Sequence, residues 1–485
     1  MPILSLIIWV PIAGMALVIL LPRTNEALIR GAAIATAGVT FLLTWGLLGS
    51  FERSTAELQF VEKTTWVAEL GMTYHIGIDG LSFPMILLAT LLGLVAVVAS
   101  TRTERNPKGY FAWMLMLEAS ILGVFMAQDW FLFYVFWELA LVPMLFLLGV
   151  WGGNRRERAA VTFFLYTLAG SIFMLLGIFA IYLESDPRSF DMATLAEASG
   201  GWSRAFQLWP FIAFFVGFGV KVPAFPLHGW LPLAHTQAPP AVCIMLSGVM
   251  LKLGAYGLLR VVDTLPLGLR EFLPWMFTIA IVNILYGALM AWRQTDLKAV
   301  IAYSSISHMG FVLLGIATLD STGLSGAMFM MLAHGVITGG LFLLVGIVKD
   351  RTGTSDLACL GGLAQRVPVF AGLLTLALLG SMGLPGLAQF VGELQVLIGA
   401  VDRWGTMAIL ASLGVVLTAG VTLRIVGSMF SRTVDDRWGA LADMNRRELI
   451  AMVPLSALTI VLGAYPSFAL RLSDATIRAM TALVP

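Results

Sequence analysis

The sequence predicts an all-α polytopic membrane protein with about 14 transmembrane helices. Of its 485 residues, 59% are apolar and 12% are charged, and the mean hydropathy is +0.90. An average soluble domain is about half apolar and about a quarter charged. The apolar residues also gather in stretches close to the roughly 20 residues that a helix needs to cross a bilayer. These observations exclude a soluble globular enzyme.

The apolar stretches give the expected helices in order along the chain. The first stretch is expected to stay as a helix, because no basic leader precedes it and no small-residue cleavage pattern follows it. The longest predicted loops are residues 51–78 and 184–208. The predicted spans are residues 2–21, 28–50, 79–100, 111–128, 130–150, 159–183, 209–230, 240–261, 272–291, 298–318, 323–348, 368–400, 406–430 and 449–470.

Two of these spans contain helix breakers, which suggests an internal repeat. Pro223 and Pro226 interrupt span seven, and Gly383-Leu-Pro-Gly386 interrupts span twelve. Broken helices in corresponding halves are typical of transporters with inverted repeats. The expected organisation is one membrane domain, residues 1–485, with three N-terminal helices (1–110), two inverted five-helix repeats (111–261 and 272–430) and a C-terminal helix (449–485).

Basic residues are distributed unevenly between alternate loops, and this predicts the orientation. The richer set, expected on the cytoplasmic side, is Arg23, Arg30, Arg102, Arg105, Lys108, Arg155, Arg156, Arg158, Arg293, Lys298, Lys349, Arg351, Arg366, Arg432, Arg437, Arg446 and Arg447. The poorer set is Arg53, Lys63, Arg188, Arg204, Arg260, Arg270, Arg403, Arg471 and Arg478. Both termini are then expected on the non-cytoplasmic side.

The sequence gives no sign of a cofactor or metal in this chain. Cys243 and Cys359 supply neither a disulfide framework nor the four ligands of an iron–sulfur cluster. No nucleotide-binding glycine loop and no cluster of metal-ligating residues is present. A net charge of +1 argues against a nucleic-acid partner.

Three basic residues fall inside apolar spans, where a charge costs from about 3 to over 10 kcal/mol. Lys221 directly precedes the break in span seven, and Lys252 lies within span eight. Both are expected to be functional, whereas Arg424 is expected to reach the cytoplasmic interface from the end of its span. Ser247 and Tyr256 lie five and four residues from Lys252.

Three acidic residues also lie inside predicted spans. Glu138 is in the middle of span five and is the natural partner of Lys221, since an isolated buried carboxylate would take up a proton. Glu118 in span four is either a second acid or a protonated hydrogen-bond donor. Glu393 follows the break in span twelve.

Two histidines in consecutive spans suggest a relay. His308 has Ser304 one turn away, and His334 has Thr338 one turn away. A lone histidine in an apolar helix is more often a satisfied core residue, but the repeated arrangement favours proton transfer. His228 and His235, which flank the prolines after span seven, are secondary candidates, and His75 is in a loop. The full set of ionisable residues predicts a proton or sodium path.

Four motifs resemble those of the antiporter-like, proton-translocating subunits of respiratory complex I, and most closely the subunit M group, the counterpart of mitochondrial subunit 4. They are Phe133-Tyr-Val-Phe-Trp-Glu138-Leu-Ala-Leu-Val-Pro143, the run from Lys221 to Pro240, Ala302-Tyr-Ser-Ser-Ile-Ser-His308-Met-Gly310 and Phe390-Val-Gly-Glu393. The resemblance extends over the whole chain. It implies the Glu138–Lys221 pair as an input half-channel, Lys252 as the connecting lysine, His308 and His334 on the central axis, Glu393 in the output half-channel, and Glu118 as an accessory acid.

The resemblance further implies a multi-pass protein of the bacterial inner membrane that moves protons while other subunits reduce quinone. Flavin, iron–sulfur clusters and quinone are expected in those partner subunits, and neighbours of the L and N type are expected in the membrane arm. Alternatives remain: a subunit of a multi-subunit sodium/proton antiporter, of a membrane-bound hydrogenase or of a photosynthetic complex I-like assembly, or a purely structural helix bundle.

Overall fold

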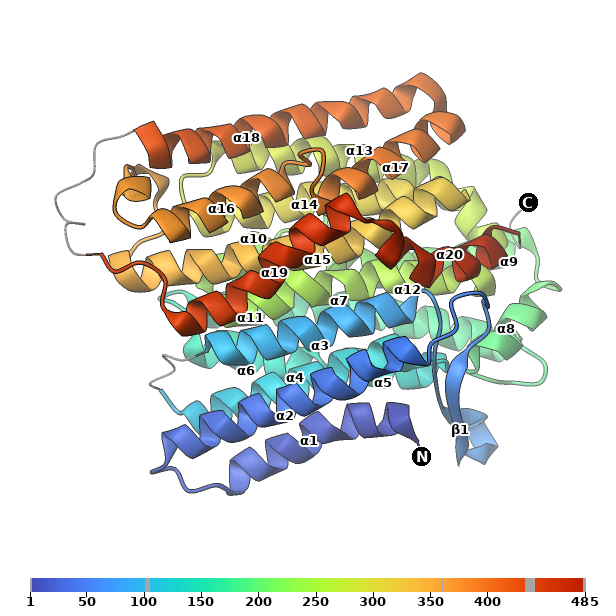
Figure 1. The fold of residues 1–485 in the computed structure, drawn as a ribbon. Helices are drawn as coiled ribbons and strands as arrows, with labels where there is room; N and C mark the ends of the chain where they lie inside the picture. Colours follow the sequence, from blue (N-terminus) through green and yellow to red (C-terminus); the bar gives the residue numbers. More distant parts are fainter. Residues whose placement is uncertain (1, 101–104, 360, 432–440, 483–485) are drawn as a thin grey trace.

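A computed structural model describes residues 2–100, 105–359, 361–431 and 441–482, and it confirms the predicted α-helical membrane class. Within these residues, 12 helices are long and apolar enough to cross a membrane. The helices run side by side along one direction, and the start of α1 and the end of α20 lie at the same end of the bundle (Figure 1). We call this the termini end. The opposite end, where α7 begins with Arg155, Arg156 and Arg158, is called the basic end.

The helices follow the predicted order. The N-terminal group is α1 (Ile3–Leu20), α2 (Glu26–Gly46) and α3 (Ser82–Ala99). Next come α4 (Pro107–Met126), α5 (Trp130–Leu139), α6 (Leu141–Trp151), α7 (Arg156–Glu184), α8 (Met192–Ser199), α9 (Arg204–Lys221), α10 (Trp230–Gln237), α11 (Pro240–Met245) and α12 (Leu251–Thr264). The remainder are α13 (Pro266–Arg293), α14 (Leu297–Ile316), α15 (Ser321–Thr352), α16 (Pro368–Ser381), α17 (Ala388–Trp404), α18 (Ser412–Ser431), α19 (Arg446–Ala464) and α20 (Ser467–Ala482).

The two predicted breaks separate α9 from α10 and α16 from α17. Span twelve is therefore not one long helix, and α16 has only 14 residues, fewer than the roughly 20 that cross a bilayer. Proline explains the second break, because Pro385 has no N–H to donate to the carbonyl of Ser381 four residues earlier. Gly383 and Gly386 adopt positive φ angles of 77° and 92° in the same segment.

An unpredicted irregularity lies between α11 and α12. Residues Leu246–Met250 form a π-helical turn, and Lys252 follows it at the start of α12. Single π-helical turns inside α-helices are frequently found at functional sites. The sequence carried no proline or paired glycine to reveal this one.

The predicted loop 51–78 contains an antiparallel hairpin instead, so the chain is not entirely α-helical. Strand β1 (Gln59–Val67) pairs with β2 (Met72–Ile78), and the turn between them uses Gly71 at φ 65°. The hairpin packs at the termini end (Figure 1). In its first strand, apolar and polar residues do not alternate strictly, which explains why the sequence did not reveal it.

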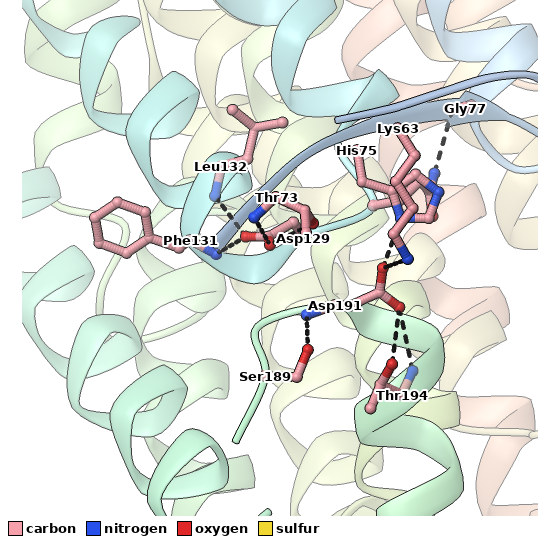
Figure 2. A network of polar contacts seen from close by, with 11 residues as sticks. Lys63, Thr73, His75, Gly77, Asp129, Phe131, Leu132, Ser189, Asp191 and Thr194 are labelled. Carbon is pink, nitrogen blue, oxygen red and sulfur yellow. Dashed lines mark hydrogen bonds and ion pairs between the residues drawn. The ribbon is translucent and has the colours of Figure 1, made fainter. Parts of the chain in front are cut away.

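Two aspartates join the hairpin to the helices (Figure 2). Asp129 begins α5 and accepts hydrogen bonds from the amides of Phe131 and Leu132 as well as from Thr73 of β2. Asp191 begins α8 and lies 2.7 Å from both Lys63 Nζ and His75 Nδ1. Burial opposes charge on Asp191, but the hydrogen bonds from His75 and Lys63 outweigh it and hold the pKa of its carboxyl well below the usual range.

Two basic residues that were assigned to loops lie inside the bundle, so their assignment was wrong. Lys298 is in α14, 2% exposed, and donates to the carbonyl of Ala238 at 2.8 Å. Arg260 is in α12, 8% exposed, and forms a bidentate ion pair with Asp79. Both residues lie at the edge of a predicted span, 298–318 and 240–261, and the helices there continue to Leu297 and Thr264. Arg102, Arg432 and Arg437 lie outside the described residues.

Arg424, which is expected to reach the cytoplasmic interface, extends toward the end of a neighbouring helix. Its guanidinium donates to the carbonyls of Trp292 and Gln294, where α13 ends. A cation at a helix C-terminus also interacts favourably with the helix dipole. A structural role therefore accounts for Arg424.

Asp191→Asn should destabilise the hairpin side of the protein. Losing the charged acceptor leaves His75 and Lys63 without their partner, at an expected cost of about 1–3 kcal/mol. Because folding depresses the pKa of this carboxyl, its contribution is present above the ordinary value of about 3.9 and is lost as the pH falls through the lower folded value. Thermal unfolding in detergent should show a lower Tm at pH 7, a similar loss at pH 4, and a smaller difference from the wild type only well below about pH 3.9, near pH 2.

The matched control is Asp474→Asn, because Asp474 forms an exposed pair with Arg478 on α20. Exposed pairs of this kind contribute only about 0.3–0.5 kcal/mol. An equal loss of Tm in both variants would contradict the structural role of Asp191.

Candidate functional site

The predicted ionisable residues lie inside the helix bundle, several of them at or near the ends of their helices. Glu118, Lys221, Lys252, His308, His334 and Glu393 are each 4% exposed or less. Glu138 is partly buried. Burial of so many ionisable groups is costly unless each is neutral, paired or close to water. Their surroundings therefore decide what each can do.

Lys221 is the last residue of α9 and projects toward α5. Its ammonium lies 4.8 Å from the ring centroid of Trp137, a cation–π distance, and has no hydrogen-bond partner within the described chain. Glu138 follows Trp137 and interacts electrostatically with Lys221. The predicted direct contact between Glu138 and Lys221 is absent from the described ion pairs. The two charges interact at longer range in this conformation.

The side chain of Glu138 has neutral neighbours as well. Ser171 of α7 and Tyr134, one turn earlier in α5, interact with its carboxyl group. One carboxyl oxygen of Glu138 has no partner among the residues described. Neutral side chains therefore hold the carboxyl group of Glu138, and no described ion pair joins it to Lys221.

Lys252 makes the most direct polar contact of the set. Its Nζ lies 2.7 Å from Nδ1 of His334 and 2.6 Å from the carbonyl of Ser247, inside the π-helical turn. Two nitrogens form a hydrogen bond only if one donates a proton and the other accepts it. When Lys252 is protonated it can only donate, and Nδ1 of His334 accepts. Lys252 and His334 therefore share one proton along this line.

His308 of α14 lies beside His334 of α15. Its ring centroid lies 5.5 Å from that of His334, and neither of its ring nitrogens has a hydrogen-bond partner in the described residues. The hydroxyls that were expected to join the relay do not do so. Ser304 and Thr338 donate to carbonyls of their own helices, those of Ile301 and His334.

Glu393 lies one turn into α17, beyond the second break. Gln389, four residues earlier, donates its amide to Glu393 Oε1 at 3.0 Å and to the carbonyl of Ser381 at 2.8 Å. Gly383 provides the space for the carboxyl group, because a Cβ at this position would lie 2.3 Å from Glu393 Oε2. Sequence reasoning missed Gln389, although its i,i+4 spacing from Glu393 is a usable signal.

Glu118 and His235 make no described side-chain hydrogen bond to the other candidate residues. Both carboxyl oxygens of Glu118 lack partners in the described chain, and its side chain packs against Gly93 of α3. His235 stacks on Phe342 and interacts electrostatically with Lys298 and Lys252. It therefore lies near the Lys252–His334 pair.

His228 is not brought to this group of residues. Its ring packs against Phe225 and Tyr286, with centroids 5.5 and 4.9 Å away. Burial in an aromatic cluster accounts for it.

A second polar group, also missed from the sequence, lies at the termini end of α12. Arg260 donates to Tyr256 as well as to Asp79, and Tyr256 donates to the carbonyl of Phe125. A cavity of about 200 Å³ borders the pair and Asp263. In the described residues, no group of three or more His, Cys, Asp or Glu side chains could hold a metal ion.

Comparisons with known proteins identify the class. The family model for the NADH:quinone oxidoreductase/Mrp antiporter transmembrane family matches residues 127–418. The chain is 38% identical to NADH-quinone oxidoreductase subunit M of Rhodobacter capsulatus, over 96% of this chain and 93% of the relative. It is 39% identical to NAD(P)H-quinone oxidoreductase chain 4 1 of Synechococcus elongatus, over 100% of this chain and 92% of the relative.

Solved structures agree with this result. A chain of respiratory complex I from Thermus thermophilus superposes with a TM-score of 0.91 at 30% identity, with each chain covered completely. A chain of the Mrp complex from Dietzia has a TM-score of 0.88 at 21% identity, over 100% of this chain and 99% of that one, and shows the fold alone. The protein therefore belongs to the NADH:quinone oxidoreductase/Mrp antiporter family of membrane subunits, with subunit M and chain 4 among its full-length relatives.

Gly383→Ala should displace Glu393. The new Cβ would meet the carboxyl group of Glu393, and the positive φ of 77° would add backbone strain of about 1–2 kcal/mol. Proton uptake into inside-out vesicles, measured per NADH oxidised, should fall in the assembled complex. Gly386→Ala is the matched control, since Gly386 has a φ of 92° but no atom within 4 Å of its Cβ position. Equal effects of the two substitutions would show that strain, and not Glu393, is responsible.

Proposed function

We propose that this chain is a proton-translocating membrane-arm subunit of an NADH:quinone oxidoreductase, of the subunit M or chain 4 kind. Full-length identity to such subunits supports this function. The observation that carries the mechanism is the 2.7 Å contact between Lys252 and His334, buried between the two broken helices. A scaffold would gain no stability from a lysine and a histidine at that place.

The first step of the proposed mechanism takes place at Lys221. Its charge is stabilised by the Trp137 ring and by the nearby Glu138 carboxyl group. A movement of Glu138 away from Lys221 would remove the counter-charge and favour release of the proton from the ammonium. The lack of a fixed ion pair supports a movable Glu138. Its return would favour protonation of Lys221 again.

In the second step, the proton passes along the central residues. Lys252 takes it up and gives it to His334 through their existing contact. His308 then receives it across the 5.5 Å between the two rings, which requires a water molecule or a rotation of one imidazole. His308 can accept because its ring nitrogens make no competing hydrogen bond in the described chain.

In the last step, Glu393 accepts the proton and releases it to the far side of the membrane. Moving one charge against 100 mV costs about 2.3 kcal/mol, so an external drive is needed. In the proposed mechanism, quinone reduction in partner subunits supplies this free energy. Flavin, iron–sulfur clusters and quinone are placed in those subunits by this proposal.

The proposal also places the chain in the bacterial inner membrane between neighbours of the L and N type. The basic end would face the cytoplasm, and both termini the opposite side. Supporting this, the start of α1 and the end of α20 share one end of the bundle (Figure 1), and Arg155, Arg156 and Arg158 lie where α7 begins at the other.

Lys221→Ala should abolish most pumping by this subunit. Glu138 would lose its buried base and would take up a proton instead of remaining as an unpaired ion, so the complex should still assemble. Proton uptake into inside-out vesicles and NADH:quinone turnover should both fall, with assembly checked on a native gel. Lys221→Arg should rescue only partly, because guanidinium does not release its proton.

Lys108→Ala is the control, since Lys108 lies in the first turn of α4, away from these residues. An assembled Lys221→Ala complex with the wild-type number of protons per electron would remove Lys221 from the mechanism and would overturn the proposed path.

A further inference from the structure

The second broken helix exposes a backbone carbonyl that must find a partner outside the helix. In an uninterrupted helix the carbonyl of Ser381 would accept from residue 385, but Pro385 has no N–H. A buried carbonyl without a hydrogen bond is destabilising. Gln389 supplies the missing donor at 2.8 Å.

Gln389 makes a second contact with the same amide group. Its Nε2 also donates to Oε1 of Glu393 at 3.0 Å, and its side chain is 0% exposed. Its own carbonyl oxygen has no partner among the residues that the structure describes. Gln389 therefore holds Glu393 against the break through two donated hydrogen bonds and is free to accept another.

One of the two central histidines reaches the same part of the backbone. His308 lies against the backbone of Ser381, and neither of its ring nitrogens completes a hydrogen bond with a described group. The order of groups is therefore His308, the Ser381 carbonyl, Gln389 and Glu393. A carboxamide therefore joins the backbone beside His308 to Glu393.

We propose that Gln389 is a positioning residue that separates Glu393 from His308 until the proton is to be released. A carboxamide neither gains nor loses a proton at ordinary pH, unlike the lysine, histidine and carboxyl groups on either side. While its amide is bound to Ser381 and Glu393, no proton can pass through it. Transfer then requires the amide to swing away and water to connect His308 with Glu393. The inference rests on the proposed function and adds a gate to it.

At the first helix break, too, a side-chain N–H donates to a backbone carbonyl that the break leaves free. There the indole Nε1 of Trp230 donates to the carbonyl of Val220 at 2.9 Å, directly before Lys221. The backbone N–H of Ala224, four residues on, bonds to Gly219 instead, so the Val220 carbonyl is left for a side chain. In both halves, a non-titratable side-chain N–H fills the break beside the ionisable residue. The recurrence supports a role in control of proton transfer as well as in stability.

Gln389→Glu tests the gate directly, because it puts a protonatable group where the amide was. Passive decay of an imposed pH gradient in vesicles, without NADH, should accelerate at least about tenfold, which corresponds to a barrier lower by about 1.4 kcal/mol. The number of protons pumped per electron should fall, while NADH:quinone turnover continues. A change in folding alone would not open such a leak in an assembled complex.

Gln395→Glu is the matched control, since Gln395 lies on the same helix, is partly buried and is not hydrogen-bonded to Glu393. Wild-type proton leak in Gln389→Glu, or an equal leak in Gln395→Glu, would overturn the gate. If Gln389→Glu fails to assemble, Gln389→Met removes both donated bonds without adding a carboxyl group. It should lower the protons pumped per electron while Gln395→Met does not, and an unchanged ratio would overturn the inference.

Failure of the gate and failure of the proposed function give different results. Lys221→Ala tests the path itself, so a path without a gate would show lost pumping in Lys221→Ala and no leak in Gln389→Glu. Wild-type pumping in Lys221→Ala would reject the path, whatever Gln389→Glu does.

Discussion

The structure depends on one constraint: a charge buried away from water must be neutralised, paired or given hydrogen bonds. Arg260 meets it with Asp79, and Lys298 meets it with a helix-end carbonyl. These groups are fixed. Lys221 meets it only in part, through the ring of Trp137 and a carboxyl group at longer range. The incompletely satisfied groups are the ones suited to lose and regain protons.

The same constraint governs the two helix breaks. Each break frees backbone carbonyls in a region where water is scarce, and side chains must satisfy them. Trp230 and Asn283 do this at the first break, and Gln389 at the second. Trp230 and Gln389 come from the helix that follows each break, and Asn283 comes from α13. These side chains therefore fix the position of Lys221 and Glu393 as well as the course of the backbone.

Much of the site could be predicted from the sequence, because a lysine or glutamate in an apolar stretch stands out and proline marks a break. Burial of Lys252 and Glu393 followed directly. Contacts between distant segments could not be predicted: the Lys252–His334 contact joins residues 82 positions apart, and the Asp79–Arg260 pair joins residues 181 apart. The hairpin and the π-helical turn were also missed, since their stability comes from tertiary contacts and not from a local pattern.

The most direct test of the account is the number of protons pumped per electron by an assembled complex carrying Lys252→Met. Methionine keeps most of the side-chain volume but removes the proton that Lys252 shares with His334. The account predicts a lower ratio, with wild-type pumping retained in Lys349→Met, a change near the end of α15, four turns beyond His334. A wild-type ratio in assembled Lys252→Met would contradict the account, because the buried contact at its centre would then carry no protons.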